Sequence, residues 1–190
     1  CIQIAWQLHD VSGNCIEHND FIIRPDDFDI PFESEQIHGV STALAQELGK
    51  PIDIVLENFI NVLKQSNYVV GHNLNFDVNV IAAELDRLSL NSSITSIEVI
   101  DTGTEETAVL CQLPGGRGGK FKLPTLSELY NHIFNDLFEH AHNATADVEA
   151  TARIFFELLR NRKLNTKNLI ELDSISQKII NTFSSTVPLV

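Results

Sequence analysis

The alternation of apolar and polar positions predicts a β-hairpin at the start of the chain and alternating helices and strands after it. Apolar and β-branched residues recur over residues 2–8 and 16–23, and a turn sequence separates them. Apolar positions at helical spacing predict helices over 51–63, 76–88, 126–134 and 144–160, and short apolar runs predict strands over 68–71 and 97–100. We therefore expect an α/β fold.

The remaining segments are expected to form loops, one short helix and a tail. Residues 24–40 contain prolines, a glycine and several acids, which predicts a loop, and Ser41 opens a short helix that Gly49 and Pro51 close. A length of 190 residues fits one domain better than two. We expect that domain to cover 1–160 and a tail or linker, with one weak helix, to cover 161–190.

Composition indicates a globular chain without a membrane span or leader. Hydrophobic residues make up 43%, and no apolar run approaches the ~18 residues of a membrane helix. The three cysteines are far apart and form no C-x-x-C pattern, so neither disulfides nor zinc are indicated and a cytoplasmic location is expected. Methionine is absent, even at position 1, so we expect this sequence to be part of a longer chain.

The charge distribution limits the ligands that the chain can bind. A net charge of −13 excludes broad electrostatic adhesion to nucleic acid or anionic lipid. Residues 113–122 are the exception, because they contain four glycines and three basic residues but no acid. This segment is either a flexible solvated loop or a phosphate-binding loop, with Arg117 and Lys120 as the candidate contacts.

Two carboxylates stand near predicted helix starts. On a wheel of ~100° per residue, Asp147 falls within the apolar face of helix 144–160. Asp77 lies in the first turn of its own helix, just after the strand that ends at Gly71. Each acid alone is equally well explained as a partner of the helix dipole. Together they suit a hard cation such as Mg²⁺, because ligands gather where strands end and helices begin.

His142 lies just ahead of the helix that carries Asp147. Most of the seven histidines are expected to be surface or core residues without a chemical role. An imidazole near an inward carboxylate is nevertheless the side chain best matched to act as a general base at neutral pH. His142 is therefore the candidate catalytic residue.

Three segments resemble the motifs of the DEDDh 3′–5′ exonucleases, typified by the proofreading epsilon subunit of bacterial DNA polymerase III. These segments are Gly71-His72-Asn73-x-x-Phe76-Asp77, His142-Asn143-Ala144-x-Ala146-Asp147 and Ile37-His38-Gly39-Val40-Ser41, and Asp101-Thr102 also fits the family pattern. The resemblance spans about residues 1–160. It implies a ribonuclease H-like fold, a mixed sheet flanked by helices, with His38 and Asn73 as further substrate contacts.

One family motif is absent from the sequence. The family's first motif, D-x-E on the opening strand, supplies two of four metal-binding carboxylates, and no D-x-E precedes residues 2–8, which match the family's second strand. Asp10, Glu17 and Asp20 have the wrong spacing to replace it. We therefore expect the first central strand and its acidic pair to lie upstream, and we expect these 190 residues alone to show little activity.

The resemblance implies two-metal hydrolysis of a DNA 3′ end in replication proofreading or repair. Asp77 and Asp147 would hold two Mg²⁺ ions, for which Mn²⁺ would substitute, and His142 would take the proton from the attacking water. The products would be nucleoside 5′-monophosphates, and a replicative polymerase subunit is the expected partner. Two alternatives stay open: an RNA-trimming exonuclease with the same motifs, and a non-catalytic binding module that kept the fold.

Overall fold

Two small sheets form the centre of the fold. The computed structural model describes residues 1–90, 97–138, 143–161 and 163–164. Strands β1 (Gln3–His9) and β2 (Cys15–Ile22) pair antiparallel, and β3 (Tyr68–Gly71) and β4 (Glu98–Asp101) pair parallel. Within the described residues, the two sheets share no ladder. The hairpin and both short strands confirm the sequence-based elements.

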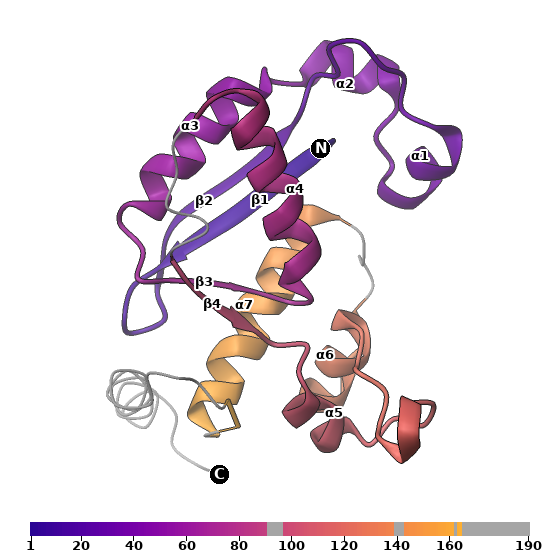
Figure 1. Ribbon diagram of the computed structural model, residues 1–190. Helices are drawn as coiled ribbons and strands as arrows, with labels where there is room; N and C mark the ends of the chain where they lie inside the picture. The colour runs from indigo at the N-terminus through magenta and orange to yellow at the C-terminus, as the bar shows by residue number, and fades with distance from the viewer. Residues whose placement is uncertain (91–96, 139–142, 162, 165–190) are drawn as a thin grey trace.

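Helices cover both faces of these sheets (Figure 1). Helices α3 (Ile52–Leu63) and α4 (Leu74–Arg87) pack on one face, where Trp6 and Val69 join the same core cluster. Helix α7 (Ala144–Arg160) crosses the other face, where Phe155 and Leu159 pack against β3 and β4. Because the same helices cover both sheets, the sheets form one layer of a three-layer α/β fold.

Smaller elements extend from both ends of this layer. Helices α1 (Phe32–His38) and α2 (Thr42–Leu48) follow the hairpin. Helix α5 (Glu105–Cys111), the 3₁₀ turn η1 (Arg117–Gly119) and helix α6 (Leu126–Phe134) follow β4. Leu129 and Tyr130 of α6 bury against Ile154 of α7, which fixes this part of the chain against the central layer. No described helix is long and apolar enough to cross a membrane.

Two helices differ from the sequence-based expectation. Residues 24–40 were expected to form a loop, but they contain α1, which begins at Pro31 as its N-cap and buries none of its residues. Helix α5 was not predicted, because its capping box pairs Thr104 with Thr107 instead of the usual acid or amide. The helix expected at 169–183 lies outside the described residues.

Candidate active site

The candidate site forms at the edge where the parallel strands end. Gly71, the last residue of β3, pairs with Asp101, the last residue of β4, so the segments leaving both strands lie together. The segment after Gly71 turns at Asn73, which has a left-handed backbone (φ 58°), and enters α4. Asp77 lies in the first turn of that helix.

Asp101 caps helix α4 from a neighbouring strand. Its Oδ1 accepts hydrogen bonds from the backbone N–H groups of Asn73 (2.8 Å) and Gly103 (2.7 Å), and its Oδ2 accepts from Leu74 N–H (2.9 Å). Asn73 is the N-cap residue of α4, but its own side chain makes no capping hydrogen bond. Both oxygens of Asp101 are therefore engaged in satisfying the helix start.

Asp77 is under electrostatic strain that Asp101 and Asp147 help to create. The pKa of its carboxyl is raised above the usual value, first by loss of solvent around it and then by the negative charges of Asp101 and Asp147. The Asp77 side chain is exposed at the surface, yet the protein around its carboxyl removes enough solvent to disfavour the charged form. The structure therefore brings Asp77 and Asp147 into one electrostatic site.

Asp147 reaches this site from the first turn of α7. The N-cap of α7 is Asn143, whose Oδ1 accepts from Ala146 N–H at 3.2 Å. Asp147 is half-buried, as its place on the apolar side of the helical wheel predicts. Two helix starts, those of α4 and α7, thus direct a carboxylate each toward the same edge of the sheet.

His72 and Thr102 hold the strand ends in register beneath these carboxylates. Thr102 is fully buried, and its backbone N–H donates to Gly71 O at 2.9 Å. His72 contacts Thr102 Oγ1 through Nδ1 (2.9 Å) and Pro124 O through Nε2 (3.0 Å). Because a carbonyl can only accept, Nε2 carries a proton, and the ring ties the chain ahead of α6 to the end of β3.

The other predicted site residues lie in different places. His38 ends α1, and its Nδ1 accepts from Val40 N–H at 3.1 Å, while its buried Nε2 has no partner among the described residues. Arg117 and Lys120 lie on the loop that contains η1, where Lys120 pairs with Glu105 at 2.5 Å. His142 lies outside the described residues, so its expected role stays a prediction.

A cavity of about 540 Å³ connects the α1–α2 region with the start of α7. Both His38 and Asn143 line it, although they are far apart in the sequence. Asp20 also lines it and accepts hydrogen bonds from Gln3 Nε2 (2.8 Å) and from the Thr145 hydroxyl. Sequence patterns could not reveal this cavity, because its walls come from segments that no local motif connects.

The described residues supply a pair of candidate metal ligands rather than a complete set. No group of three or more His, Cys, Asp or Glu side chains within the described ranges is placed to hold a metal ion. Asp101 is near, but its oxygens are engaged by backbone N–H groups. Asp77 and Asp147, which lie in the first turns of α4 and α7, are therefore the candidate ligands for a cation.

Sequence comparison decides the family. The profile of the RNase T exonuclease family matches residues 2–155, which include all the segments described above. The chain belongs to this exonuclease family. Membership confirms the exonuclease class that the three motifs indicated.

Relatives of this exonuclease domain act in longer proteins. The 3′-5′ exonuclease DinG of Bacillus subtilis (strain 168) is 31% identical over 180 residues, which are 94% of this chain and 18% of that protein. The DNA polymerase III subunit epsilon of Rickettsia prowazekii (strain Madrid E) is 27% identical over 163 residues, covering 84% of this chain and 66% of that subunit. The chain thus spans about a fifth to two thirds of these relatives.

A solved structure supports the fold. E. coli Exonuclease I in complex with a dA16 oligonucleotide superposes with a TM-score of 0.67 at 22% identity, over 85% of this chain and 37% of that one. A zinc-bound form of an Exonuclease I complex with single-stranded DNA gives a TM-score of 0.68 at 20% identity, over 96% of this chain and 39% of that one. These similarities confirm the ribonuclease H-like fold.

The different tasks of Asp101 and Asp77 give opposite expectations for stability. Asp101→Ala leaves three backbone N–H groups without their acceptor, so it should lower the free energy of unfolding by roughly 1–3 kcal/mol. Asp77→Asn removes the like-charge repulsion and should keep or raise that free energy. Urea unfolding in EDTA at pH 7 measures both.

The pH dependence of the Asp77→Asn effect follows from its raised pKa. At low pH, Asp77 is protonated in folded and unfolded chains, so the variant has no advantage. As the pH rises above 3.8, the unfolded chain loses its proton first, and the wild type loses stability until the raised pKa is passed. The advantage of the variant should grow across that window and then stay constant. Destabilisation by Asp77→Asn as large as that by Asp101→Ala would contradict this assignment.

Proposed function

We propose that this chain is the catalytic domain of a 3′–5′ exonuclease that removes nucleoside 5′-monophosphates from DNA 3′ ends. The observation that carries the proposal is the electrostatic coupling of Asp77 with Asp147 at the starts of two helices, in a chain of the exonuclease family. Carboxylates crowded beside each other destabilise a fold, and functional sites are where such arrangements occur. The names of the DNA polymerase III relatives favour DNA over RNA as the substrate.

The residues present fit a divalent cation. Asp77 and Asp147 offer hard oxygen donors, which Mg²⁺ prefers and Mn²⁺ also accepts. The like charges that raise the pKa of Asp77 are those that a cation would neutralise. A bound divalent ion would polarise the scissile phosphate and promote ionisation of the attacking water. Two ions need more carboxylates than these two side chains provide.

The remaining carboxylates are proposed to come from a strand between the two sheets. Within the described residues, β1 pairs with β2 alone and β3 pairs with β4 alone, while α7 packs against both β1 and β3. A strand between β1 and β3 would join the sheets into one and end beside Gly71, near Asp77. The D-x-E expected upstream would then face Asp77 and Asp147.

The proton of the attacking water is proposed to pass to His142. This histidine precedes the N-cap residue Asn143 and stands five residues before Asp147 in the sequence. A neutral imidazole accepts a proton at Nδ1 or Nε2. His142 would act on the water and leave cation binding to the aspartates.

The substrate's terminal nucleotide is proposed to bind between the α1–α2 region and the starts of α7 and α4. The cavity beside His38 and Asn143 has the size of small-molecule sites, roughly 300–1,000 Å³, and the partnerless Nε2 of His38 is free to donate to a base or sugar. Phe76 is 69% exposed next to Asp77, so its ring is available for stacking. Asn73, the N-cap residue of α4, lies at the start of the helix that carries Phe76.

The first expectation concerns the two aspartates in the natural full-length protein. Asp77→Asn or Asp147→Asn should reduce Mg²⁺-dependent release of 5′-monophosphates from a single-stranded DNA by at least about 100-fold, because the charge that stabilises the transition state is lost. Asp86→Asn, the same substitution at an exposed position near the other end of α4, is the matched control.

Substrates labelled at either end and RNA of the same sequence complete that assay. Degradation from the 5′ end would contradict the polarity, and faster removal of ribonucleotides would favour the RNA-trimming alternative. Near-normal turnover in Asp77→Asn or Asp147→Asn would show that the site assignment is wrong. Binding of DNA without turnover in the wild type would favour the non-catalytic alternative.

The role of His142 is separable from cation binding. His142→Ala should lower the rate by about 10²–10⁴-fold, and the wild-type rate should rise with pH through a value near that of an ordinary imidazole, about 6.5. Calorimetric titration with Mn²⁺ should give similar affinities for His142→Ala and the wild type. A loss of affinity as severe as that of Asp147→Asn would make His142 a ligand instead.

The proposed central strand is testable by hydrogen exchange on the full-length protein. The β3 amides that do not bond to β4 should exchange slowly, because a second neighbour would accept from them. Rapid exchange of these amides, or an upstream sequence without an acidic pair, would contradict the proposal.

The relatives' names suggest the setting. Several are DNA polymerase III PolC-type proteins or an epsilon subunit, so we propose a role in replication proofreading or repair, with a polymerase as the partner.

A further inference from the structure

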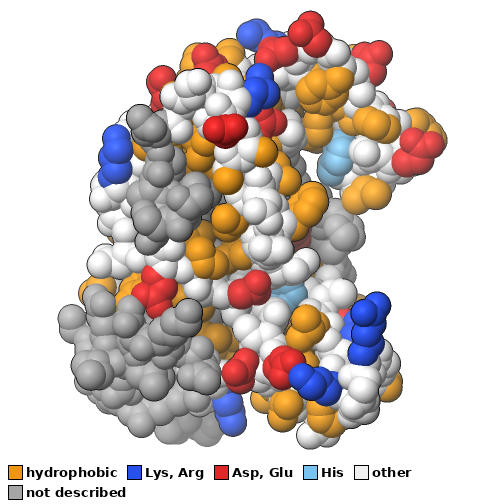
Figure 2. Space-filling model, in the orientation of Figure 1, with side chains coloured by type: hydrophobic (Ala, Val, Ile, Leu, Met, Phe, Trp, Pro, Cys, Tyr) orange, Lys and Arg blue, Asp and Glu red, His pale blue; other side chains and the backbone are white. Residues whose placement is uncertain are grey.

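The longest stretch without an acid lies close to the candidate site. No Asp or Glu occurs between Glu106 and Glu128, whereas three of the chain's basic residues, Arg117, Lys120 and Lys122, fall within it. The chain as a whole has a net charge of −13, but this segment carries no negative side chain that would repel a polyanion. Figure 2 shows Lys and Arg side chains at the end of the molecule that holds α5 and α6, beside acidic ones, and both kinds also occur at the end that holds α2.

The loop has a defined backbone rather than an arbitrary path. Lys122 N–H donates to Leu113 O at 2.9 Å, which closes the segment at its base. A Cβ added at Gly116 would lie 2.3 Å from Lys120 O, so the two sides of the loop pass within backbone contact. Gly118 has a φ of +66°, a left-handed conformation that favours glycine. The glycines thus allow the loop to fold back on itself.

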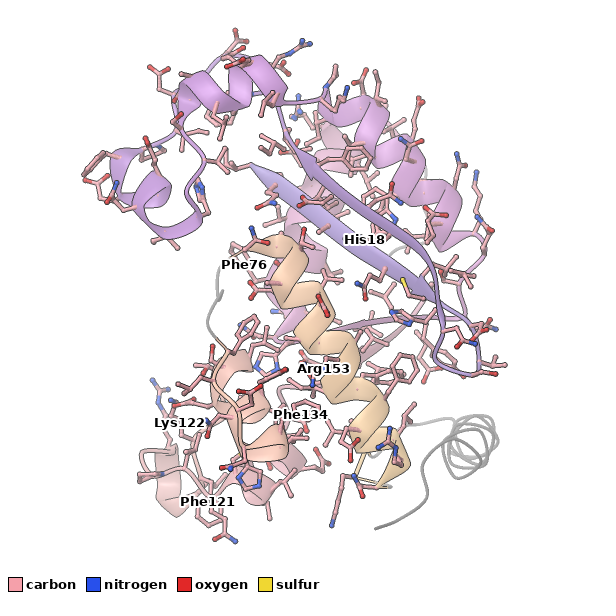
Figure 3. All side chains as sticks on the ribbon, turned by 180° about the vertical axis from the view of Figure 1, so that it is seen from behind. His18, Phe76, Phe121, Lys122, Phe134 and Arg153 are labelled. Carbon is pink, nitrogen blue, oxygen red and sulfur yellow. The ribbon has the colours of Figure 1, made fainter. Side chains whose placement is uncertain are left out.

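Two contacts attach the loop to the candidate site. Pro124, just after the loop, accepts a hydrogen bond from His72 Nε2 at 3.0 Å, and His72 directly follows the end of β3. Lys120 pairs with Glu105, which is four residues after Asp101 and therefore within about 14 Å of it along the chain. In Figure 3, Phe76 beside the site and the Phe121–Lys122 segment lie along the same edge of the molecule.

The three basic side chains differ in how free they are to bind phosphate. Lys122 is bound by both oxygens of Glu128, at 2.7 and 2.9 Å, and this contact lowers the pKa of Glu128. The pair of Lys120 with Glu105 is solvent-exposed on both sides, so a phosphate can displace it at little cost. Arg117 is exposed and has no ion pair within the described part of the chain. Availability therefore decreases from Arg117 to Lys120 to Lys122.

The loop also presents an apolar surface beside its cations. Phe121 is 42% exposed and Leu123 is 51% exposed. Exposed aromatic rings beside basic side chains are the combination that binds single-stranded nucleic acid, because bases stack on rings while cations contact the phosphates. Double-stranded nucleic acid would leave an aromatic ring without an exposed base face to stack on.

We propose that the loop from Gly115 to Leu123 binds the single strand upstream of the 3′ end, with Arg117 on a phosphate and Phe121 against a base. This inference rests on the proposed exonuclease function, which places the 3′ end at Asp77 and Asp147. The loop holds the strand outside the carboxylate site, so it acts on polymers more strongly than on a single nucleotide. Arg117 contributes most, and Lys120 contributes after releasing Glu105.

The test compares a polymer with a mononucleotide in the natural full-length protein. Arg117→Glu should lower kcat/KM for a (dT)12 strand about tenfold more than kcat/KM for the p-nitrophenyl ester of thymidine 5′-monophosphate, because the ester has no upstream phosphates. Lys64→Glu is the matched control, since Lys64 is an exposed cation at the end of α3, ahead of β3 and away from the site. The control should leave the ratio of the two kcat/KM values unchanged.

Equilibrium binding separates the loop from catalysis. Anisotropy of fluorescein-labelled (dT)12 in EDTA, measured at several salt concentrations, should show weaker binding by Arg117→Glu and a salt slope smaller by about 0.7, the value for one lost phosphate contact. If the charge reversal disturbs the fold, the same measurement is made on Arg117→Gln, which removes the charge without reversing it. Phe121→Ala should weaken binding without changing the slope.

The outcomes distinguish the two proposals. One outcome is that the wild type turns over both substrates and that Arg117→Glu and Lys64→Glu have the same ratio of kcat/KM on the polymer to kcat/KM on the ester. This outcome would overturn the loop proposal but not the proposed exonuclease function. No turnover of either substrate would overturn the proposed function, and the anisotropy comparison would still decide whether the loop binds the strand. Equal losses on polymer and mononucleotide would also overturn the loop proposal, because they would place Arg117 at the reacting nucleotide.

Discussion

Asp101 joins the end of β4 to the start of α4 through two hydrogen bonds, from the backbone N–H groups of Asn73 and Leu74, and the geometry of the candidate site depends on this junction. A helix start needs acceptors for its free N–H groups, and here a neighbouring strand supplies them. The direction in which α4 leaves the sheet is thereby fixed, and with it the position of Asp77 one turn later. His72 extends the same junction through Thr102 to Pro124, so the basic loop is anchored to it as well.

The aspartates at this edge of the sheet have different effects on stability. Asp101 stabilises the fold, because its charge is compensated by N–H dipoles. Asp77 lacks that compensation, and the pKa of its carboxyl is raised by loss of solvent and then by the charges of Asp101 and Asp147. A chain selected only for stability would replace Asp77 with a neutral side chain. The proposed cation site accounts for its presence in the first turn of α4, beside Asp147, because a bound cation would offset these negative charges.

Local signals in the sequence explain which parts of the fold could be predicted. Helices α6 and α7 begin where expected because each has a local N-terminal cap. Thr125 and Glu128 form a capping box at the start of α6, and Asn143 caps α7. Helix α1 was not predicted, because it buries no side chain and its sequence therefore shows no helical repeat of apolar residues. At the site, motifs identified Asp77 and Asp147, but they could not reveal the capping role of Asp101, whose partner Asn73 lies 28 residues away. Contacts between distant segments depend on the sheet register, which no single motif encodes.

The distribution of charge explains how so acidic a chain can accept a polyanion. At a Debye length of ~8 Å in physiological salt, acids beyond the immediate surroundings of the site are largely screened. Under the proposed function, the charges that matter are those within that distance of the strand, where a cation at Asp77 and Asp147 would offset their charge and residues 113–122 contribute no acid. Substrate and cation then favour each other's binding, since each reduces the repulsion that the other meets. The net charge of the whole chain limits non-specific adhesion and leaves this local binding intact.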